Sequence, residues 1–291
     1  MKIGVVGAGL MGAEIALVFA IAGMDVLLND RDQGRLDIAM RRLGSLLDRG
    51  VARGLYRADE AEAGLRNIST STTIERFADR DLVIEAVFEA VEVKRAVLEQ
   101  LARTCRDDCV IASNTSTIPI STLAAFIPVE RRGKVIGTHF FSPVSRMALV
   151  EVVPGFDTGG DTVSFVIDCL DKIGKRPIRV KDVPGFAVNR LLHAMLIEAV
   201  KLVEEGVVAP DDLDLACRLG LGHPLGPFQL MDLVSSGLCL QVQEILQEAY
   251  GERFRPPALL KQRVRAGYEG GRGKPGWLPG PDPAPVSGEV K

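Results

Sequence analysis

The N-terminal stretch of the chain reads KIGVVGAGLMG over residues 2–12. A β-branched run fills residues 2–6 and apolar residues with helical spacing follow the glycines, so the pattern predicts a strand, a glycine turn and a helix. Each glycine of the G-x-G-x-x-G pattern has its own use. Gly7 permits the tight turn, Gly9 lets a pyrophosphate approach the backbone, and Gly12 lets helix and strand pack closely. The N-terminal end of the helix then attracts the phosphates.

A second apolar run, over residues 25–29, ends in Asp30. An acidic side chain there accepts hydrogen bonds from a ribose 2′-hydroxyl and repels a 2′-phosphate, so NAD is favoured over NADP. Arg31 weakens this preference, because an arginine beside the ribose can bind a phosphate instead. A tight turn without a ligand is the alternative interpretation of the glycines. We expect NAD as the cofactor, with the contacts of the turn made by Gly7, Gly9, Leu10, Met11 and Gly12.

Composition and charge narrow the class of protein. The chain has 291 residues, 47% hydrophobic and 25% charged, which is ordinary for a globular protein with room for two domains. The net charge of −3 predicts no nucleic-acid partner, because such partners require a concentrated basic surface. Five cysteines without C-x-x-C spacing predict reduced thiols, with neither a disulfide framework nor a metal site.

The sequence also predicts that the protein has no membrane partner and no export signal. Met1 precedes the first strand by one residue, which leaves no room for a targeting peptide. Its apolar runs fall short of the roughly 20 residues that span a bilayer. We therefore expect a cytoplasmic protein.

Strand and helix patterns alternate as far as about residue 182. A helical hairpin is expected over residues 33–64, and the later patterns predict strands at 68–71, 81–87 and 109–113 with a helix at 91–103. This repetition predicts an α/β fold, a Rossmann doubly wound parallel sheet that binds ligands at the carboxyl ends of its strands.

Beyond that point the periodicity becomes helical throughout. The predicted helices cover residues 188–205, 210–219, 228–250 and 257–265. We therefore expect an NAD-binding Rossmann domain over residues 1–182 and an all-α domain over residues 183–291. Residues 270–291 are rich in glycine and proline, and we expect them to be extended or disordered after Trp277.

A histidine and a glutamate form the first candidate catalytic pair. His139 ends an apolar run that starts at Val135, so a strand would deliver it to the edge of the sheet. Glu151 interrupts another apolar run, and a buried carboxylate needs a partner. If the two meet, the carboxylate fixes the imidazole and stabilises its protonated form, leaving the other ring nitrogen to move a substrate proton. The alternative is two unrelated polar residues at strand ends.

Two further polar positions are candidates for the same crevice. Residues 113–117 follow a predicted strand, so the hydroxyl of Ser116 would face the side of the sheet that carries His139; a serine-rich turn that caps the next helix is the alternative. Asn189 stands near the start of the first helix of the second domain. It is interpreted equally well as a helix cap and as a group that reaches the substrate.

Taken together, these motifs resemble the L-3-hydroxyacyl-CoA dehydrogenases, in particular the short bacterial 3-hydroxybutyryl-CoA dehydrogenase type. The likeness runs from residue 1 to about residue 268. The motifs that carry it are Gly7–Gly12, Glu85–Glu89 with Lys94, Ser113–Ser116, His139–Phe141, Glu151 and Pro184–Arg190.

The resemblance implies a role for each matching residue. His139 would be the general base and Glu151 its orienting partner, while Ser116 and Asn189 would bind the substrate oxygen. Asp30, Glu89 and Lys94 would contact NAD, with Ser116 also near the cofactor. The resemblance further implies a homodimer formed through the helical domain.

Three positions depart from the pattern of the family. Ser142 stands where the family usually has asparagine after His-Phe-Phe. Residues 234–237 read Val-Ser-Ser-Gly instead of Val-Gly-Leu-Asp, and residues 271–277 keep only a shortened, proline-bearing form of the C-terminal signature. These changes put substrate choice and the edge of the helical domain in question, whereas the His139–Glu151 pair is intact.

The function expected from these residues is hydride transfer between NAD and C3 of a short-chain 3-hydroxyacyl-CoA, which interconverts the C3 hydroxyl and keto groups. One alternative is an NAD-dependent dehydrogenase of a β-hydroxy acid without CoA, such as a sugar acid. Another is a non-catalytic NAD-binding structural protein. Ser45, Arg49 and Arg53 of the predicted hairpin could meet the CoA phosphates, although a solvated helix face explains them equally well.

Overall fold

The structure of the protein is a computed structural model that describes residues 1–271 and 273–278. The chain divides into two compact units, Met1–Phe186 and Ala187–Lys291. The predicted tail after Trp277 lies outside the described residues from position 279 onward.

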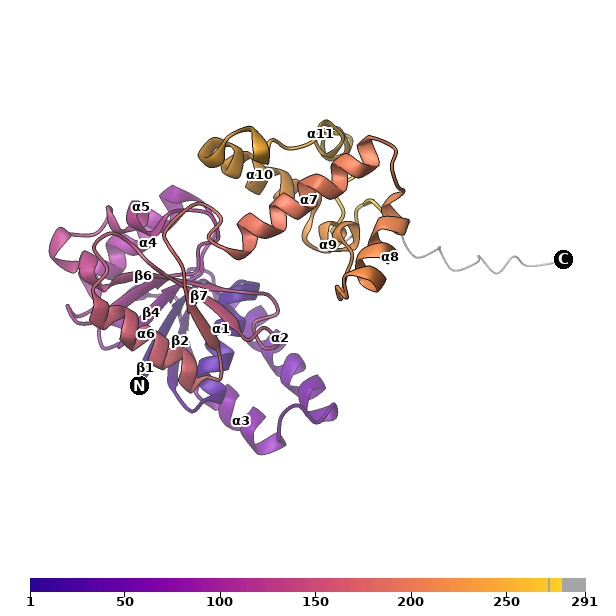
Figure 1. Cartoon of the computed structure of the whole chain (residues 1–291). Helices are drawn as coiled ribbons and strands as arrows, with labels where there is room; N and C mark the ends of the chain where they lie inside the picture. Colours follow the sequence, from indigo (N-terminus) through magenta and orange to yellow (C-terminus); the bar gives the residue numbers. More distant parts are fainter. Residues whose placement is uncertain (272, 279–291) are drawn as a thin grey trace. The chain divides into compact units, whose positions relative to one another are not determined.

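The first unit is built on one eight-stranded sheet with the strand order β3-β2-β1-β4-β5-β6-β7-β8 (Figure 1). The strands are β1 (Lys2–Val6), β2 (Asp25–Asn29), β3 (Ile68–Ser71), β4 (Leu82–Glu85), β5 (Val110–Ser113), β6 (Val135–Phe140), β7 (Leu149–Pro154) and β8 (Arg176–Arg179). Strands β1 to β6 pair in parallel, as the sequence predicts for a Rossmann fold.

The sheet is not parallel throughout, because β7 runs antiparallel to β6. Only residues 141–148 join these two strands, whereas a parallel crossover needs about a dozen residues or more. Strand β8 then pairs with β7 in parallel. The antiparallel turn-back was not predicted, and it decides the geometry of the candidate site.

Helices cover both faces of the sheet. One face packs against α1 (Leu10–Ile21), α2 (Gln33–Ala52), α3 (Ala58–Arg66) and α6 (Gly160–Lys172), and the other against α4 (Val91–Thr104) and α5 (Ile120–Ala124). Successive strand residues point to opposite faces, so Val5 joins the first core and Val6 the second. Each fully buried side chain of this kind stabilises the fold by about 1.5–3 kcal/mol.

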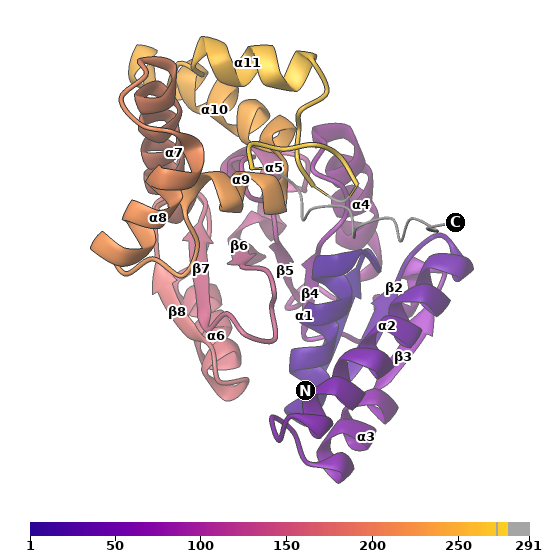
Figure 2. The ribbon, with the colours of Figure 1, turned by 90° about the vertical axis from the view of Figure 1, so that its right-hand side faces the viewer.

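The predicted helical hairpin is present, with its arms formed by α2 and α3. The two helices pack against each other and against α1, and Figure 2 shows them on the outer side of α1. The glycines at 44, 50 and 54 each offered a place for the chain to reverse, but helix α2 continues through Gly44 and Gly50. The reversal follows Ala52, where Gly54 adopts a positive φ of 70°.

The second unit is helical. Its helices are α7 (Val188–Glu204), α8 (Pro210–Gly220), α9 (Pro227–Val234), α10 (Ser236–Tyr250) and α11 (Ala258–Arg265), with a short 3₁₀ turn at Glu252–Phe254. The core contains Leu196, Val200, Phe228 and Trp277. The prediction of one helix over 228–250 is wrong, since Ser235 has a φ of 95° and separates α9 from α10.

The C-terminal segment explains this break. The Ser236 N–H donates to the Glu269 carbonyl (2.6 Å) and the Trp277 indole N–H donates to the Ser236 hydroxyl (2.8 Å). The Asp232 carboxylate accepts from the Trp277 backbone N–H at 2.8 Å. The two departures from the family pattern in this unit, at 234–237 and 271–277, are therefore in direct contact. Hydrogen bonds to the segment replace those of a continuous helix.

Candidate active site

The candidate site lies at the carboxyl edge of the parallel strands. The last residues of β1, β2, β4 and β5 pair in register, Val6 with Asn29 and Glu85, and Glu85 with Ser113. Ser113 also pairs with Gly137 of β6, two residues before His139. The residues that immediately follow each strand therefore come together at one edge, as expected for a doubly wound sheet. This edge carries the glycine turn, Asp30, Glu89, the 114–117 loop and His139.

The predicted His139–Glu151 pair is formed. The two residues are directly opposite each other on β6 and β7, and His139 Nδ1 lies 2.7 Å from Glu151 Oε2. Glu151 is fully buried and His139 is 5% exposed. A carboxylate accepts a hydrogen bond from the Nδ1–H, so the neutral ring carries its lone pair on Nε2. The ring also contacts the Phe141 ring, with centroids 4.6 Å apart.

The antiparallel turn-back of β7 brings this pair together. In an antiparallel pair of strands, opposite side chains on one face lie about 5 Å apart, which is the reach of a histidine and a glutamate. The twelve-residue separation in sequence therefore becomes a direct contact. The arrangement can accept a proton at Nε2 while the Glu151 carboxylate stabilises the resulting imidazolium.

The glycine turn has the shape that a bound phosphate requires. Gly7 has a φ of 102°, and a Cβ on Gly12 would lie 1.9 Å from the Gly7 carbonyl oxygen, so neither position admits a side chain. A Cβ on Gly9 would meet no atom within 4 Å. The space beside Gly9 therefore remains open to a ligand.

Asp30 lies next to this turn. Its carboxylate accepts from the Ala8 N–H (3.0 Å) and from the Asp32 N–H (3.2 Å), which fixes it at the end of β2. Arg42 of α2 donates to the carbonyl of Gly9 at 2.9 Å. The sequence pattern does not single out Arg42, because one partly buried arginine among several on the same helix does not reveal its contact.

The Glu89 carboxylate organises the loop that bears Ser116. Its Oε1 accepts from the Thr115 hydroxyl (2.6 Å), the Ser116 N–H (2.9 Å) and the Thr117 N–H (3.0 Å). Burial alone would raise the pKa of Glu89, but Lys94 and these hydrogen bonds outweigh it and hold the pKa below its ordinary value. Glu89 is therefore a carboxylate at neutral pH.

Lys94 is fully buried, and its ammonium contacts two carboxylates. It lies 2.8 Å and 3.1 Å from the two oxygens of Glu85, and 3.1 Å from Glu89 Oε2. No individual role was predicted for Glu85 from the sequence. It ends the apolar run 82–84, however, and a lone glutamate in such a run is the pattern that made Glu151 a candidate.

Asn114 connects the loop to the strand of the histidine. Its side-chain oxygen accepts from the Phe140 N–H at 2.9 Å. Ser116, two residues further along, is partly buried. The structure thus ties the 114–117 loop to both Glu89 and the residue that follows His139.

The remaining predicted residues are found in separate places. Asn189 is the second residue of α7, whose N-cap is Ala187, so the alternative of an Asn189 cap does not hold. Ser45, Arg49 and Arg53 are exposed and follow one another at four-residue spacing on α2 and its C-cap.

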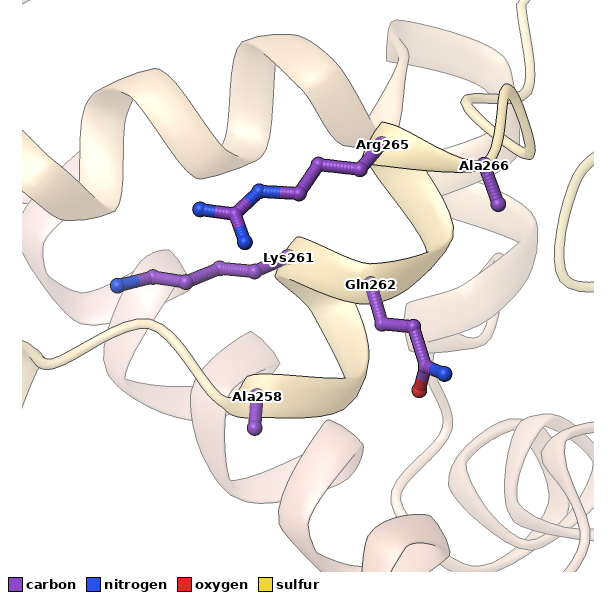
Figure 3. Close-up of a pocket in the computed structure, with 5 residues that line it drawn as sticks. All are labelled: Ala258, Lys261, Gln262, Arg265 and Ala266. Atoms are coloured by element: carbon purple, nitrogen blue, oxygen red, sulfur yellow. The ribbon is translucent and has the colours of Figure 1, made fainter.

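Two surface hollows contain none of the predicted site residues. One, of about 450 Å³, lies on α11 between Ala258 and Ala266, and Figure 3 shows Lys261 and Arg265 pointing to the same side of it. The other, of about 620 Å³, is lined by Phe156, Arg179 and Lys181. Both are open surfaces in which solvated cations face water, and they carry no catalytic group.

Within residues 1–271 and 273–278, no group of three or more histidine, cysteine or acidic side chains could hold a metal ion. Of the helices in this part of the chain, none is long and apolar enough to cross a membrane.

Comparison with known families and proteins identifies close relatives. The family model described as 3-hydroxyacyl-CoA dehydrogenase, NAD binding domain, matches residues 2–183, and the model of the C-terminal domain of the same family matches residues 185–278. A probable 3-hydroxybutyryl-CoA dehydrogenase of Deinococcus radiodurans is 40% identical, covering 93% of this chain and 96% of the relative.

Solved structures agree with these matches. The crystal structure of (S)-3-hydroxybutyryl-CoA dehydrogenase from Ralstonia eutropha has a TM-score of 0.91 and 36% identity, with 95% of this chain and 98% of that chain covered. FadB2 of M. tuberculosis has a TM-score of 0.92 and 35% identity, with 96% and 98% covered.

Proposed function

Since the chain belongs to the 3-hydroxyacyl-CoA dehydrogenase family, and is therefore an NAD-dependent oxidoreductase of 3-hydroxyacyl-CoA, we propose that its substrate is a short-chain acyl-CoA such as 3-hydroxybutyryl-CoA. The names of the relatives support this choice, because 3-hydroxybutyryl-CoA dehydrogenases match this chain over nearly their whole length. Membership of this family gives less support to the two alternative functions, a dehydrogenase of β-hydroxy acids without CoA and a non-catalytic NAD-binding protein.

The buried His139–Glu151 contact is the observation that carries the proposed mechanism. His139 Nε2 takes the proton of the C3 hydroxyl, and the chemistry that bound NAD would supply is acceptance of the hydride from C3. Glu151 stabilises the imidazolium that forms, and Ser116 and Asn189 hydrogen-bond the substrate oxygen as it changes between hydroxyl and carbonyl. In the reverse direction His139 returns the proton to the oxygen of the ketone.

The residues proposed to contact NAD lie at the same edge of the sheet. The open backbone at Gly9, with Gly7, Leu10, Met11 and Gly12 around it, suits the pyrophosphate. Asp30 beside the turn suits the ribose, and Glu89 with Lys94 suits the part of NAD near Ser116. Ser45, Arg49 and Arg53 offer hydrogen-bonding and cationic groups to the CoA phosphates.

The test compares two substrates and one variant. We expect NADH oxidation with acetoacetyl-CoA but not with free acetoacetate, and a loss in the His139→Gln variant on the order of 10² to 10⁴ in kcat with nearly unchanged NADH affinity. Equal activity on free acetoacetate would overturn the CoA assignment. Near-normal kcat in the variant would remove His139 from the mechanism.

A homodimer formed through the helical unit is the second part of the proposal. The apolar positions at helical spacing in this unit do not all face outward, because Leu196, Ala199 and Leu246 are buried in the cores of the unit itself and are not available to an interface. Apolar side chains exposed elsewhere support self-association: Leu191, Leu219 and Leu233 are each at least 70% exposed.

Light scattering across a concentration series tests this assembly. We expect a stable mass of two chains, and a mass of one chain at every concentration would contradict it.

A cytoplasmic location is also proposed. All five cysteines are free thiols, as is usual in a reducing compartment.

A further inference from the structure

Glu85, at the end of β4, is a buried carboxylate surrounded by hydrogen-bond donors. It has no exposed surface. Its Oε1 accepts from the Val87 N–H at 2.7 Å and from Lys94 at 2.8 Å, and its Oε2 accepts from the Ser113 hydroxyl at 2.6 Å and from Lys94 at 3.1 Å. Because every neighbour is a donor, the site is built for an acceptor with two equivalent oxygens.

The Lys94 ammonium connects Glu85 to Glu89, because it contacts the carboxylates of both residues. An ammonium group has three N–H donors, and three carboxylate oxygens lie within 3.1 Å of it, two from Glu85 and one from Glu89. The position of Lys94 is therefore set by two anions, of which Glu85 is the one without contact to solvent. A buried ammonium requires both partners to offset the loss of its hydration.

Glu89 in turn holds the loop of Ser116 by its backbone. The N–H groups of Ser116 and Thr117 both donate to Glu89 Oε1, at 2.9 Å and 3.0 Å, and the Thr117 hydroxyl lies 3.1 Å from the same oxygen. The other oxygen of Glu89 faces Lys94. A shift of the Lys94 ammonium therefore pulls on the carboxylate that fixes these two amides.

We propose that Glu85 is a positioning residue, which acts through Lys94 and Glu89 to hold the backbone of residues 115–117 and thereby the Ser116 side chain. Its effect on the reaction rests on the proposed function, in which Ser116 binds the substrate oxygen. Glu85 itself lies behind Lys94 with no exposed surface, so it does not contact the substrate.

The Glu85→Gln variant breaks the arrangement with little change of volume. A glutamine presents one acceptor and two donors to a site where the Val87 N–H, the Ser113 hydroxyl and Lys94 all donate. Lys94 loses an anionic partner and shifts toward Glu89. Displacement of a substrate-binding group by about 1 Å can cost roughly 100-fold in rate.

The first measurement is hydrogen–deuterium exchange of the Ser116 and Thr117 amides in the full chain. We expect their exchange in Glu85→Gln to be faster by roughly tenfold or more, because the acceptor that protects them is no longer fixed. The control is Glu92→Gln on α4, whose side chain is 82% exposed and lies outside the network. Unchanged protection in Glu85→Gln would overturn the proposal.

A second variant covers the case in which Glu85→Gln does not fold. The double variant Glu85→Gln with Lys94→Met removes both buried charges together, so that neither is left without a partner. It breaks the same connection to Glu89, and we expect the same faster exchange at residues 116 and 117. Protection equal to that of the parent protein would again contradict the proposal.

Kinetics show whether the loop acts through Ser116. We expect kcat and kcat/KM of Glu85→Gln to fall by similar factors, and little further loss when the substitution is made in Ser116→Ala. Independent, multiplying losses would overturn the route through Ser116. A fully active Ser116→Ala would instead refute the role of Ser116 in the proposed function, while the exchange rates still decide whether Glu85 holds the loop.

Discussion

Replacement of Glu151 by glutamine isolates the charge of the catalytic pair from its geometry. Glutamine has nearly the same shape and keeps an oxygen that can accept from His139 Nδ1, now 2.7 Å from Glu151 Oε2. The variant therefore preserves the orientation of the ring and removes only the negative charge. The reaction requires that charge when His139 becomes an imidazolium.

The size of the effect follows from the distance and the burial. Two unit charges 2.7 Å apart attract by about 6 kcal/mol at an effective dielectric constant of about 20, and Glu151 has no exposed surface that would lower this value further. The amide dipole retains part of the attraction. A net loss of roughly 3–5 kcal/mol in the transition state corresponds to a fall in kcat of about 10² to 10⁴.

The assay is steady-state reduction of acetoacetyl-CoA followed by NADH absorbance, with NADH affinity measured separately by fluorescence. We expect kcat to fall and the NADH affinity to stay close to that of the parent protein, since Glu151 lies away from the glycine turn. The exposed Glu92→Gln variant is the matched control. A kcat within a few-fold of the parent value would mean that the Glu151 carboxylate has only a structural role.

Three further predictions concern the cofactor, pH and stability. Asp30→Ala should narrow the preference for NADH over NADPH in kcat/KM by roughly tenfold or more, because both the ribose contact and the repulsion of a 2′-phosphate disappear; a parent protein that prefers NADPH would overturn the assignment. Burial lowers the pKa of His193 from 6.5 to about 4, so the unfolded chain takes up a proton first as the pH falls. Stability is therefore complete above about pH 6.5 and falls toward pH 4 by up to roughly 3 kcal/mol. Thermal unfolding of His193→Leu across this range should show a smaller loss than the parent, and parallel curves would contradict the cause. Ser235→Gly should raise the Tm by a few degrees, because glycine relieves about 1–3 kcal/mol of strain at a φ of 95° and loses only part of it through its own flexibility. A lower Tm would show that the hydrogen bond from the Gly237 N–H to the Ser235 hydroxyl matters more than the strain.

The sequence predicts the parts of this fold that depend on local patterns. Strand β1, the turn at Gly7 and helix α1 follow from a single short stretch, and the need of a buried carboxylate for a partner is enough to suggest the His139–Glu151 pair. The first prediction rests on residues that are close in sequence, and the second on the high energetic cost of an unpaired buried carboxylate.

The features that escaped prediction depend on distant parts of the chain. The antiparallel direction of β7 follows from the length of the 141–148 connection, which has no pattern of its own. The break at Ser235 requires hydrogen bonds between Ser236 and residues 269 and 277, which lie 33 and 41 positions later in the chain. Glu85, Glu89 and Lys94 are neighbours in sequence, but their contacts with Ser113 and residues 115–117 join segments 26–28 residues apart, and no spacing in the sequence encodes those contacts.

Trp277 is an intrinsic fluorescence probe of the helical unit. It is the sole tryptophan in the sequence, it is 7% exposed, and its ring lies 4.8 Å from that of Phe228 within the helical unit. Tryptophan emission therefore reports on Ala187–Lys291 alone, whereas far-ultraviolet circular dichroism reports on both units together. Melting curves recorded by the two signals on one unlabelled sample will separate the unfolding of the helical unit from that of the nucleotide-binding unit. A red shift of the emission will mark the moment at which the indole leaves Ser236 for water.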